Sequence, residues 1–169
     1  MVCSQDMKGY ENIELDSKIF IEDETYHELL SIISEKNKKT ETGGIIIGYY
    51  DVRYKNAIIT ECTRAPEDSR ATRCKFYRGI KGLKKILQKR WKERNEYYLG
   101  EWHLHPGSSP SPSCSDIKQM KKIVNDNNFN CKEPILMILG EVDNIQIINL
   151  MLFKNSQVFY YIESRYGVD

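Results

Sequence analysis

The chain has 169 residues, enough for one domain with its own core, and a formal net charge of +1, which argues against a protein that coats nucleic acid. No apolar run reaches the roughly 18 residues of a membrane span, and the N-terminus has no apolar signal-peptide core. The five cysteines form no Cys-x-x-Cys pair, so we expect a cytoplasmic protein with free thiols and no membrane partner.

The first part of the chain predicts one helix and three strands. Residues 1–16 are polar and irregular, which suggests a loose N-terminal arm. Residues 18–21 predict a short edge strand. A helix is expected over residues 22–39, because acidic residues at its start favour the helix dipole. A buried strand over residues 43–47 and a second strand over 56–62 flank a polar turn, so a hairpin is expected.

The second part alternates helices and strands. Residues 63–75 form a polar segment, either an exposed connection or the wall of a substrate groove. Residues 76–96 predict a long helix whose basic face is expected to be solvated, with an apolar stripe of Ile80, Leu83, Ile86, Leu87 and Trp91. A strand over 97–102 and a helix over 117–124 precede three strands, at 134–139, 145–152 and 157–162. This order predicts an α/β fold with a mixed sheet flanked by helices.

The segment from His103 to Asp116 joins the strand over 97–102 to the helix that follows. Residues i and i+2 of a strand point to one face, so His103 and His105 can aim at one point. The prolines of the loop restrict its course, and Asp116 in the first helical turn can supply a third ligand. Two imidazoles and a carboxylate suit a zinc ion with an open position for water, whose pKa zinc lowers to roughly 7.

The pattern His-x-His-Pro followed by Pro-Ser-x-x-Asp resembles the JAMM motif of the JAB/MPN family of zinc metalloproteases. Glu41, ahead of Gly43-Gly44, resembles the upstream glutamate of that family. Residues 98–103 resemble its bacterial branch, which includes deconjugating peptidases of antiphage (CBASS-type) operons. The resemblance, specific over about residues 41–118, implies a cytidine-deaminase-like three-layer sandwich, with residues 1–169 as a single domain.

The resemblance also implies an activity and a set of roles. The enzyme would be an isopeptidase with one zinc ion per chain, held by His103, His105 and Asp116. Glu41 would act as general base and then acid. Ser113 would stabilise the tetrahedral intermediate, although Ser113 and Asp116 also fit a helix capping box. The implied partners are a ubiquitin-like modifier, its conjugated target, and an operon-encoded activating or conjugating enzyme.

Three other classes of protein fit the sequence less well. A RadC-like protein associated with DNA repair carries a similar histidine block, but the chain is nearly neutral and lacks a helix-hairpin-helix candidate. An inactive MPN scaffold would have lost ligands, whereas Glu41 and the three candidate ligands are present. A zinc base deaminase needs a Pro-Cys-x-x-Cys motif that is absent. Beside the motif, Trp102 is expected in the core, Glu101 is expected to point like His103, and Cys114 is expected to be a bystander.

Overall fold

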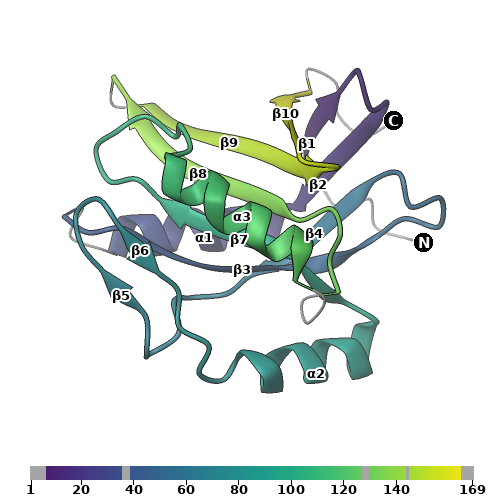
Figure 1. Cartoon of the computed structure of the whole chain (residues 1–169), viewed down its shortest axis with the longest axis horizontal. Helices are drawn as coiled ribbons and strands as arrows, with labels where there is room; N and C mark the ends of the chain where they lie inside the picture. Colours follow the sequence, from purple (N-terminus) through teal and green to yellow (C-terminus); the bar gives the residue numbers. More distant parts are fainter. Residues whose placement is uncertain (1–6, 36–38, 127–129, 144, 165–169) are drawn as a thin grey trace.

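The computed structural model describes residues 7–35, 39–126, 130–143 and 145–164, which form ten strands and three helices (Figure 1). The elements follow one another as β1 (Met7–Asn12), β2 (Ser17–Glu22), α1 (Asp23–Glu35), β3 (Thr42–Tyr50), β4 (Ala57–Cys62), β5 (Arg70–Ala71), β6 (Phe76–Tyr77), α2 (Leu83–Arg94), β7 (Tyr97–Leu104), α3 (Cys114–Asn125), β8 (Ile135–Val142), β9 (Ile145–Lys154) and β10 (Gln157–Glu163). Within the described helices, no segment combines the length and the apolar character needed to cross a membrane.

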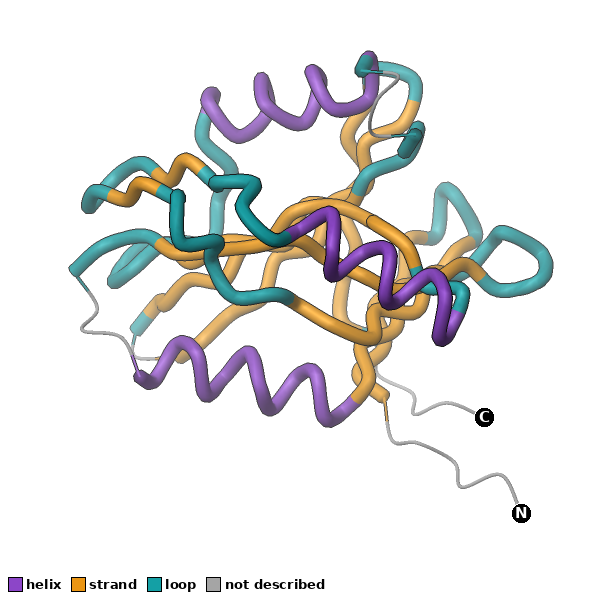
Figure 2. The backbone as a smooth tube through the Cα atoms, turned by 90° about the horizontal axis from the view of Figure 1, so that it is seen from below, coloured by secondary structure: helices purple, strands orange, loops and turns teal. Residues whose placement is uncertain are grey.

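Eight of these strands form one closed, barrel-like sheet in the order β1-β10-β9-β8-β7-β3-β4-β2, with β2 returning to β1. The pairs β2–β4 and β7–β8 are parallel and the other neighbours are antiparallel, so the sheet is mixed, as predicted. The expected three-layer sandwich is not what the structure shows, because the sheet closes on itself. The helices lie outside the strands, on different sides (Figure 2).

The closing strand comes from the segment that we expected to be a loose arm. Residues 7–12 form β1, which pairs along its whole length with β2 and through Tyr10 and Glu11 with β10. Tyr10 is buried and anchors β1 in the core. As a result β2 is an internal strand rather than an edge strand. Residues 1–6 lie outside the described residues.

The predicted helix over 76–96 begins seven residues later. Residues 76–77 instead form β6, which pairs with β5, and β5 lies in the segment 63–75 that was predicted to be a loop. Helix α2 begins after Gly82, whose φ is +83°. The predicted apolar stripe is therefore only partly right. Leu83 is buried and Ile86 and Leu87 pack beside it, but Ile80 and Trp91 are 75% and 58% exposed. The first helix ends at Glu35, and residues 36–38 of its predicted extent are outside the described residues.

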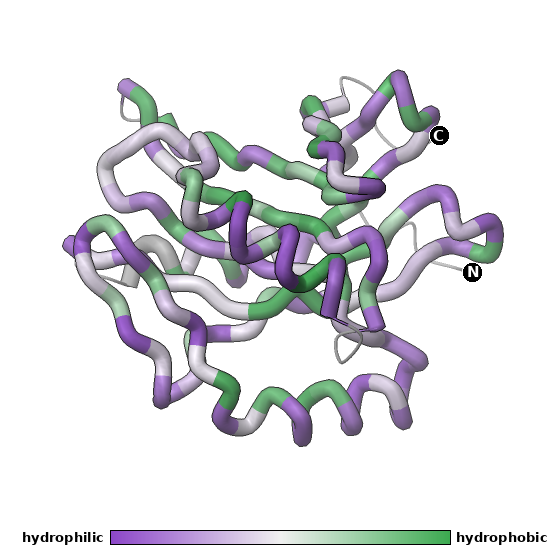
Figure 3. Tube along the Cα trace, viewed as in Figure 1, coloured by the Kyte–Doolittle hydropathy of each residue, from purple (hydrophilic) through white to green (hydrophobic). Residues whose placement is uncertain are grey.

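Side-chain alternation along β7 and β8 divides the core between two faces of the sheet. Trp102, Leu104 and Met137 point into the closed sheet and join the main core. The alternate residues Leu136 and Ile138 face outward and pack against Met120 and its neighbours on α3. Hydrophobic residues are prominent in β8 and β9, whereas hydrophilic and hydrophobic residues alternate along α2 (Figure 3). Helix α3 thus covers an apolar part of the outer face, beside which the histidines lie.

Candidate metal centre

Two histidines lie at the end of β7 on the outer face of the sheet. Their backbone positions alternate with Trp102 and Leu104, which enter the core, so both imidazoles point to the side of the sheet that α3 covers. The two rings stack with their centroids 4.9 Å apart. His103 is 8% exposed and His105 is 9% exposed. The structure thus places both imidazoles together, as the strand spacing predicts.

Asp116 reaches the histidines from the first turn of α3. Its Oδ2 atom lies 3.7 Å from His103 Nε2 and 3.8 Å from His105 Nε2. A capping box fixes the carboxylate: the Ser113 backbone N–H donates to Asp116 Oδ2 at 2.6 Å, and the Asp116 N–H donates to Ser113 Oγ at 3.2 Å. The hydrogen bonds that begin the helix therefore also orient the predicted third ligand.

The donor set fits a metal ion. One candidate ligand atom from each of the three side chains lies within 4.8 Å of the others. In the described part of the chain, His103 Nε2 is the one buried side-chain nitrogen or oxygen without a hydrogen-bond partner, which is costly unless a ligand satisfies it. His105 Nδ1 lies 3.3 Å from the Ser109 carbonyl oxygen, an arrangement that leaves Nε2 as the ligand atom.

The electrostatics keep two of these side chains in the forms that bind metal. Burial alone would raise the pKa of Asp116, but the nearby His103 and the hydrogen bonds from Ser113 outweigh it and lower the pKa to about 2. Burial, together with the neighbouring His103, lowers the pKa of His105 below its ordinary value. At neutral pH the carboxylate is therefore charged and the His105 imidazole is neutral.

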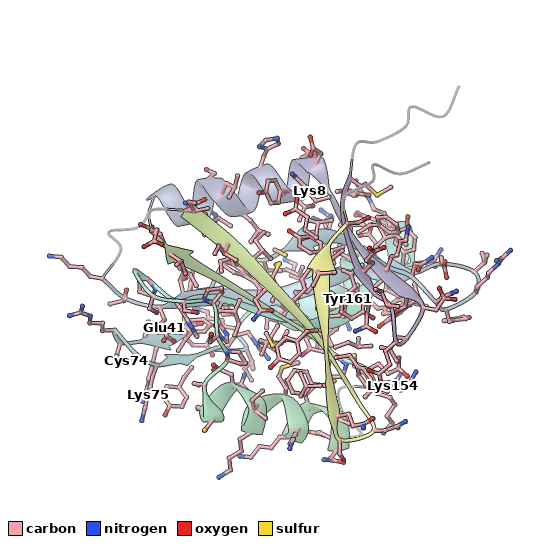
Figure 4. The ribbon with its side chains drawn as sticks, turned by 90° about the horizontal axis from the view of Figure 1, so that it is seen from above. Lys8, Glu41, Cys74, Lys75, Lys154 and Tyr161 are labelled. Carbon is pink, nitrogen blue, oxygen red and sulfur yellow. The ribbon has the colours of Figure 1, made fainter. Side chains whose placement is uncertain are left out.

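Glu41 lies just before β3, half-buried beside the cluster. Its backbone N–H donates to the Thr72 carbonyl oxygen at 2.9 Å, in the turn between β5 and β6. Figure 4 accordingly shows Glu41 on the same side of the molecule as Cys74 and Lys75 of that turn. Burial raises the pKa of the Glu41 carboxyl, His103 opposes this effect, and Asp116 adds to it. His103 and Asp116 of the cluster therefore both act on the Glu41 carboxyl group electrostatically.

The remaining expectations near the motif can be placed as well. Ser113 is exposed, and the helix begins at Cys114, whose side chain is also exposed. Trp102 is buried, as predicted, and donates its indole N–H to the Thr63 carbonyl oxygen at 2.9 Å. Glu101 is 3% exposed and lines a small pocket with His103 and Asp116, so it does point like His103.

Sequence reasoning missed Arg78, which lies in the same pocket. Its guanidinium pairs with the Glu101 carboxylate, with Nε to Oε2 at 2.5 Å and Nη2 to Oε1 at 2.8 Å. A signal for it was available, because a carboxylate predicted on a buried strand face needs a cationic partner. The partner could not be chosen among 25 lysines and arginines without the fold.

Two buried imidazoles and a carboxylate, with a glutamate nearby that is not in the ligand set, define a candidate metallohydrolase. Comparison with known proteins narrows this class. Residues 24–152 match the family described as prokaryotic homologs of the JAB domain, and the chain belongs to this family. The resemblance seen in the motif is thereby confirmed.

Several named relatives are similar to this chain. A CD-NTase/cGAS isopeptidase of Enterobacter hormaechei subsp. hoffmannii is 48% identical over 100 residues, which are 59% of this chain and 55% of that relative. The match therefore spans about half the length of that relative. A CD-NTase/cGAS isopeptidase of Escherichia coli is 32% identical over 129 residues, 75% of this chain and 78% of that protein. The probable metalloprotease y4qB of Sinorhizobium fredii is 26% identical over 102 residues, 59% of this chain and 62% of that protein.

A solved structure shares the fold. The solution structure of protein DSY2949 from Desulfitobacterium hafniense superposes with a TM-score of 0.61 and covers 84% of this chain and 88% of its own. The two sequences are 14% identical, so this likeness concerns the fold alone.

Proposed function

We propose that this chain is a zinc-dependent isopeptidase that removes a ubiquitin-like modifier from a lysine or from a precursor tail. The observation that carries the proposal is the buried cluster of His103, His105 and Asp116, in which His103 Nε2 accepts or donates no hydrogen bond among the described residues. Membership of the JAB family and the isopeptidase and metalloprotease names of the relatives support the same reaction class. A set of two imidazoles and one carboxylate is a known ligand set of catalytic zinc.

The chemistry divides between the metal and the protein. When bound by the three ligands, zinc supplies a Lewis acid that makes hydroxide available near neutral pH. Glu41 takes a proton from the attacking water and later gives it to the departing amine nitrogen, so that one water is added across the amide bond. The raised pKa of Glu41 suits this exchange, because a carboxylate with a raised pKa is a stronger base toward the attacking water than an ordinary glutamate.

Ser113 fits a supporting role in the same step. Its Oγ atom accepts the Asp116 N–H as part of the helix cap, which leaves the hydroxyl proton available to donate. Because Ser113 is exposed beside the ligand Asp116, that proton can reach an oxyanion on the substrate carbonyl. The cap and the stabilisation of the intermediate therefore use different parts of one hydroxyl group.

The relatives' names suggest a substrate class. Two of them are named for action on CD-NTase/cGAS proteins, and we propose isopeptide conjugates that contain such a protein as substrates here. An operon-encoded activating or conjugating enzyme would make the conjugate that this chain cleaves. The walls beside the cluster, namely residues 63–75, the start of β3 and residues 107–111, would hold the extended tail that leads to the scissile bond.

The test compares substrates and variants of the zinc-loaded chain. A CD-NTase/cGAS protein joined to a ubiquitin-like modifier, the modifier's tail peptide alone, and casein are offered separately. We expect cleavage of the conjugate and little of the other two. Glu41→Gln should keep one zinc per chain and lose cleavage, whereas Glu163→Gln, which changes an exposed glutamate of β10 paired with Lys8, should behave as wild type. Equal turnover of all three substrates would leave a general peptidase and refute the deconjugase.

A further inference from the structure

A buried ion pair lies next to the candidate ligands and has no part in the reaction as described above. Glu101 is two residues before His103 on β7, and its side chain is 4% exposed, while that of Arg78 is 9% exposed. Both Glu101 oxygens bind the guanidinium, and the Tyr98 hydroxyl donates to Oε1 at 2.8 Å. Because the Arg78 guanidinium pairs with Glu101 through two nitrogens, both its orientation and its distance from the carboxylate are fixed. The position of Arg78 is therefore set by β7, which carries Glu101.

Arg78 also ends the small β5–β6 hairpin. It follows β6 directly, and β6 pairs with β5 through Arg70–Tyr77 and Ala71–Phe76. The base of the hairpin is closed by two side chains. The Asp68 carboxylate accepts the backbone N–H groups of Ile80 and Lys81, each at 3.0 Å, and Ser69 Oγ accepts that of Gly79 at 2.9 Å. Among these contacts, the Arg78–Glu101 pair ties the hairpin to the strand that carries the histidines.

The other end of the hairpin holds Glu41. The Thr72 N–H donates to the Lys75 carbonyl oxygen at 2.8 Å, and the Thr72 carbonyl accepts the Glu41 N–H at 2.9 Å. A continuous path of short contacts therefore runs from β7 through Glu101, Arg78 and the hairpin to Glu41. One end of this path, Glu101, is two residues before the candidate ligand His103, and the other end is the proposed base Glu41.

We propose that Arg78 is a positioning residue, which sets the place of Glu41 relative to the histidines through the β5–β6 hairpin. The inference rests on the proposed role of Glu41 as general base. Without the guanidinium, the buried Glu101 carboxyl group loses two hydrogen-bond donors, so Glu101 and the hairpin must rearrange. Because the base acts in the transition state, a displaced Glu41 lowers kcat and leaves KM nearly unchanged.

The experiment uses the zinc-loaded chain with Arg78→Ala, Arg78→Lys and Arg90→Ala. Arg90 is the matched control, because it also pairs with a partly buried glutamate, Glu61, but on α2 and away from the ligands. Three quantities are measured: zinc per chain, kcat and KM for the conjugate, and the exchange rate of the Glu41 backbone amide. We expect Arg78→Ala to keep its zinc, to lose about 10²-fold in kcat, and to exchange the Glu41 amide faster.

The variants separate positioning from a loss of stability. Arg78→Lys keeps the charge but cannot make the two-point pair, so its kcat should fall by an intermediate factor; it also serves if Arg78→Ala does not fold. Arg90→Ala should match wild type in kcat and in Glu41 exchange. Wild-type kcat and exchange in both Arg78 variants, or an equal loss in Arg90→Ala, would overturn the proposal. If the wild-type chain cleaves nothing, the proposed function fails, while exchange at Glu41 still decides whether Arg78 holds that segment.

Discussion

Gly43 offers a direct test of how closely the sheet holds the candidate ligands. It lies in β3 opposite His103 of β7. A Cβ atom added at Gly43 would lie 2.2 Å from the Trp102 carbonyl oxygen and 2.8 Å from His103 Cβ, whereas ordinary contacts begin at 3.4 Å. The variant Gly43→Ala must therefore separate β3 from β7 by about 1 Å at this point.

The size of the effect follows from that displacement. Overpacking of this kind costs about 1–3 kcal/mol, which lowers Tm by roughly 2–4 °C for each kcal/mol in a chain of this length. Moving His103 by about 1 Å also disturbs the ligand geometry, and a displacement of that size at a reacting centre costs on the order of 10²-fold in rate. Zinc affinity should fall with the cleavage rate, because His103 is a proposed ligand.

The assay measures Tm, zinc affinity and cleavage of the conjugate for Gly43→Ala and for Gly9→Ala. Gly9 is the matched control, because a Cβ there would meet Phe20 Cε1 at 3.4 Å, an ordinary contact on the far strand β1. We expect Gly9→Ala to behave as wild type. A Gly43→Ala protein with wild-type zinc affinity and wild-type rate would refute the claim that the β3–β7 contact sets the position of His103.

Three further predictions concern the site. His103→Ala should lose zinc in elemental analysis, whereas the exposed His27→Ala should keep it. Ser113→Ala removes the helix cap, so it should cost about 1 kcal/mol of stability in denaturant titrations and about 10²–10³ in cleavage rate. A chelator removes zinc, so that the charge of Asp116 alone is tested. The pKa of about 2 for Asp116 in the folded protein lies below its ordinary value of 3.8, so the charged form stabilises the fold. Asp116→Asn should then be up to about 2 kcal/mol less stable than wild type above pH 4, and the difference should vanish as the pH falls through 2. A pH-independent difference would contradict this linkage.

The grouping of the three candidate ligands can be predicted from the sequence because it depends on local geometry. Alternation along one strand puts His103 and His105 on one face, and the spacing to the capping box puts Asp116 in the first turn of α3. Each of these relations is decided within fourteen residues. The long strands β3 and β8 are also predicted from the sequence because their buried apolar runs are continuous, and β9 contains a shorter buried run near its end.

The closure of the sheet could not be predicted in this way. The pairing of Tyr10 with Glu163 joins segments from opposite ends of the described chain, and β1 contains little that marks it as a strand apart from the buried Tyr10. The start of α2 was misplaced for a different reason. The apolar residues before Leu83 fit a helical period, but Gly79 sits against Asp68 and Gly82 takes a left-handed conformation, so the helix cannot extend backwards.

The same contrast separates the ligands from the proposed base. Asp116 owes its orientation to hydrogen bonds with Ser113, three residues away, and any chain with this local sequence can form them. Glu41 precedes Thr42, which pairs with Leu104 of β7, and its N–H is held by Thr72 of a hairpin that is tied through Arg78 to Glu101. A short motif can therefore bring the candidate ligands together, whereas the proposed alignment of the base involves contacts between segments far apart in sequence. For this reason we expect substitutions at Arg78 or Glu101 to change the rate of cleavage while the metal stays bound.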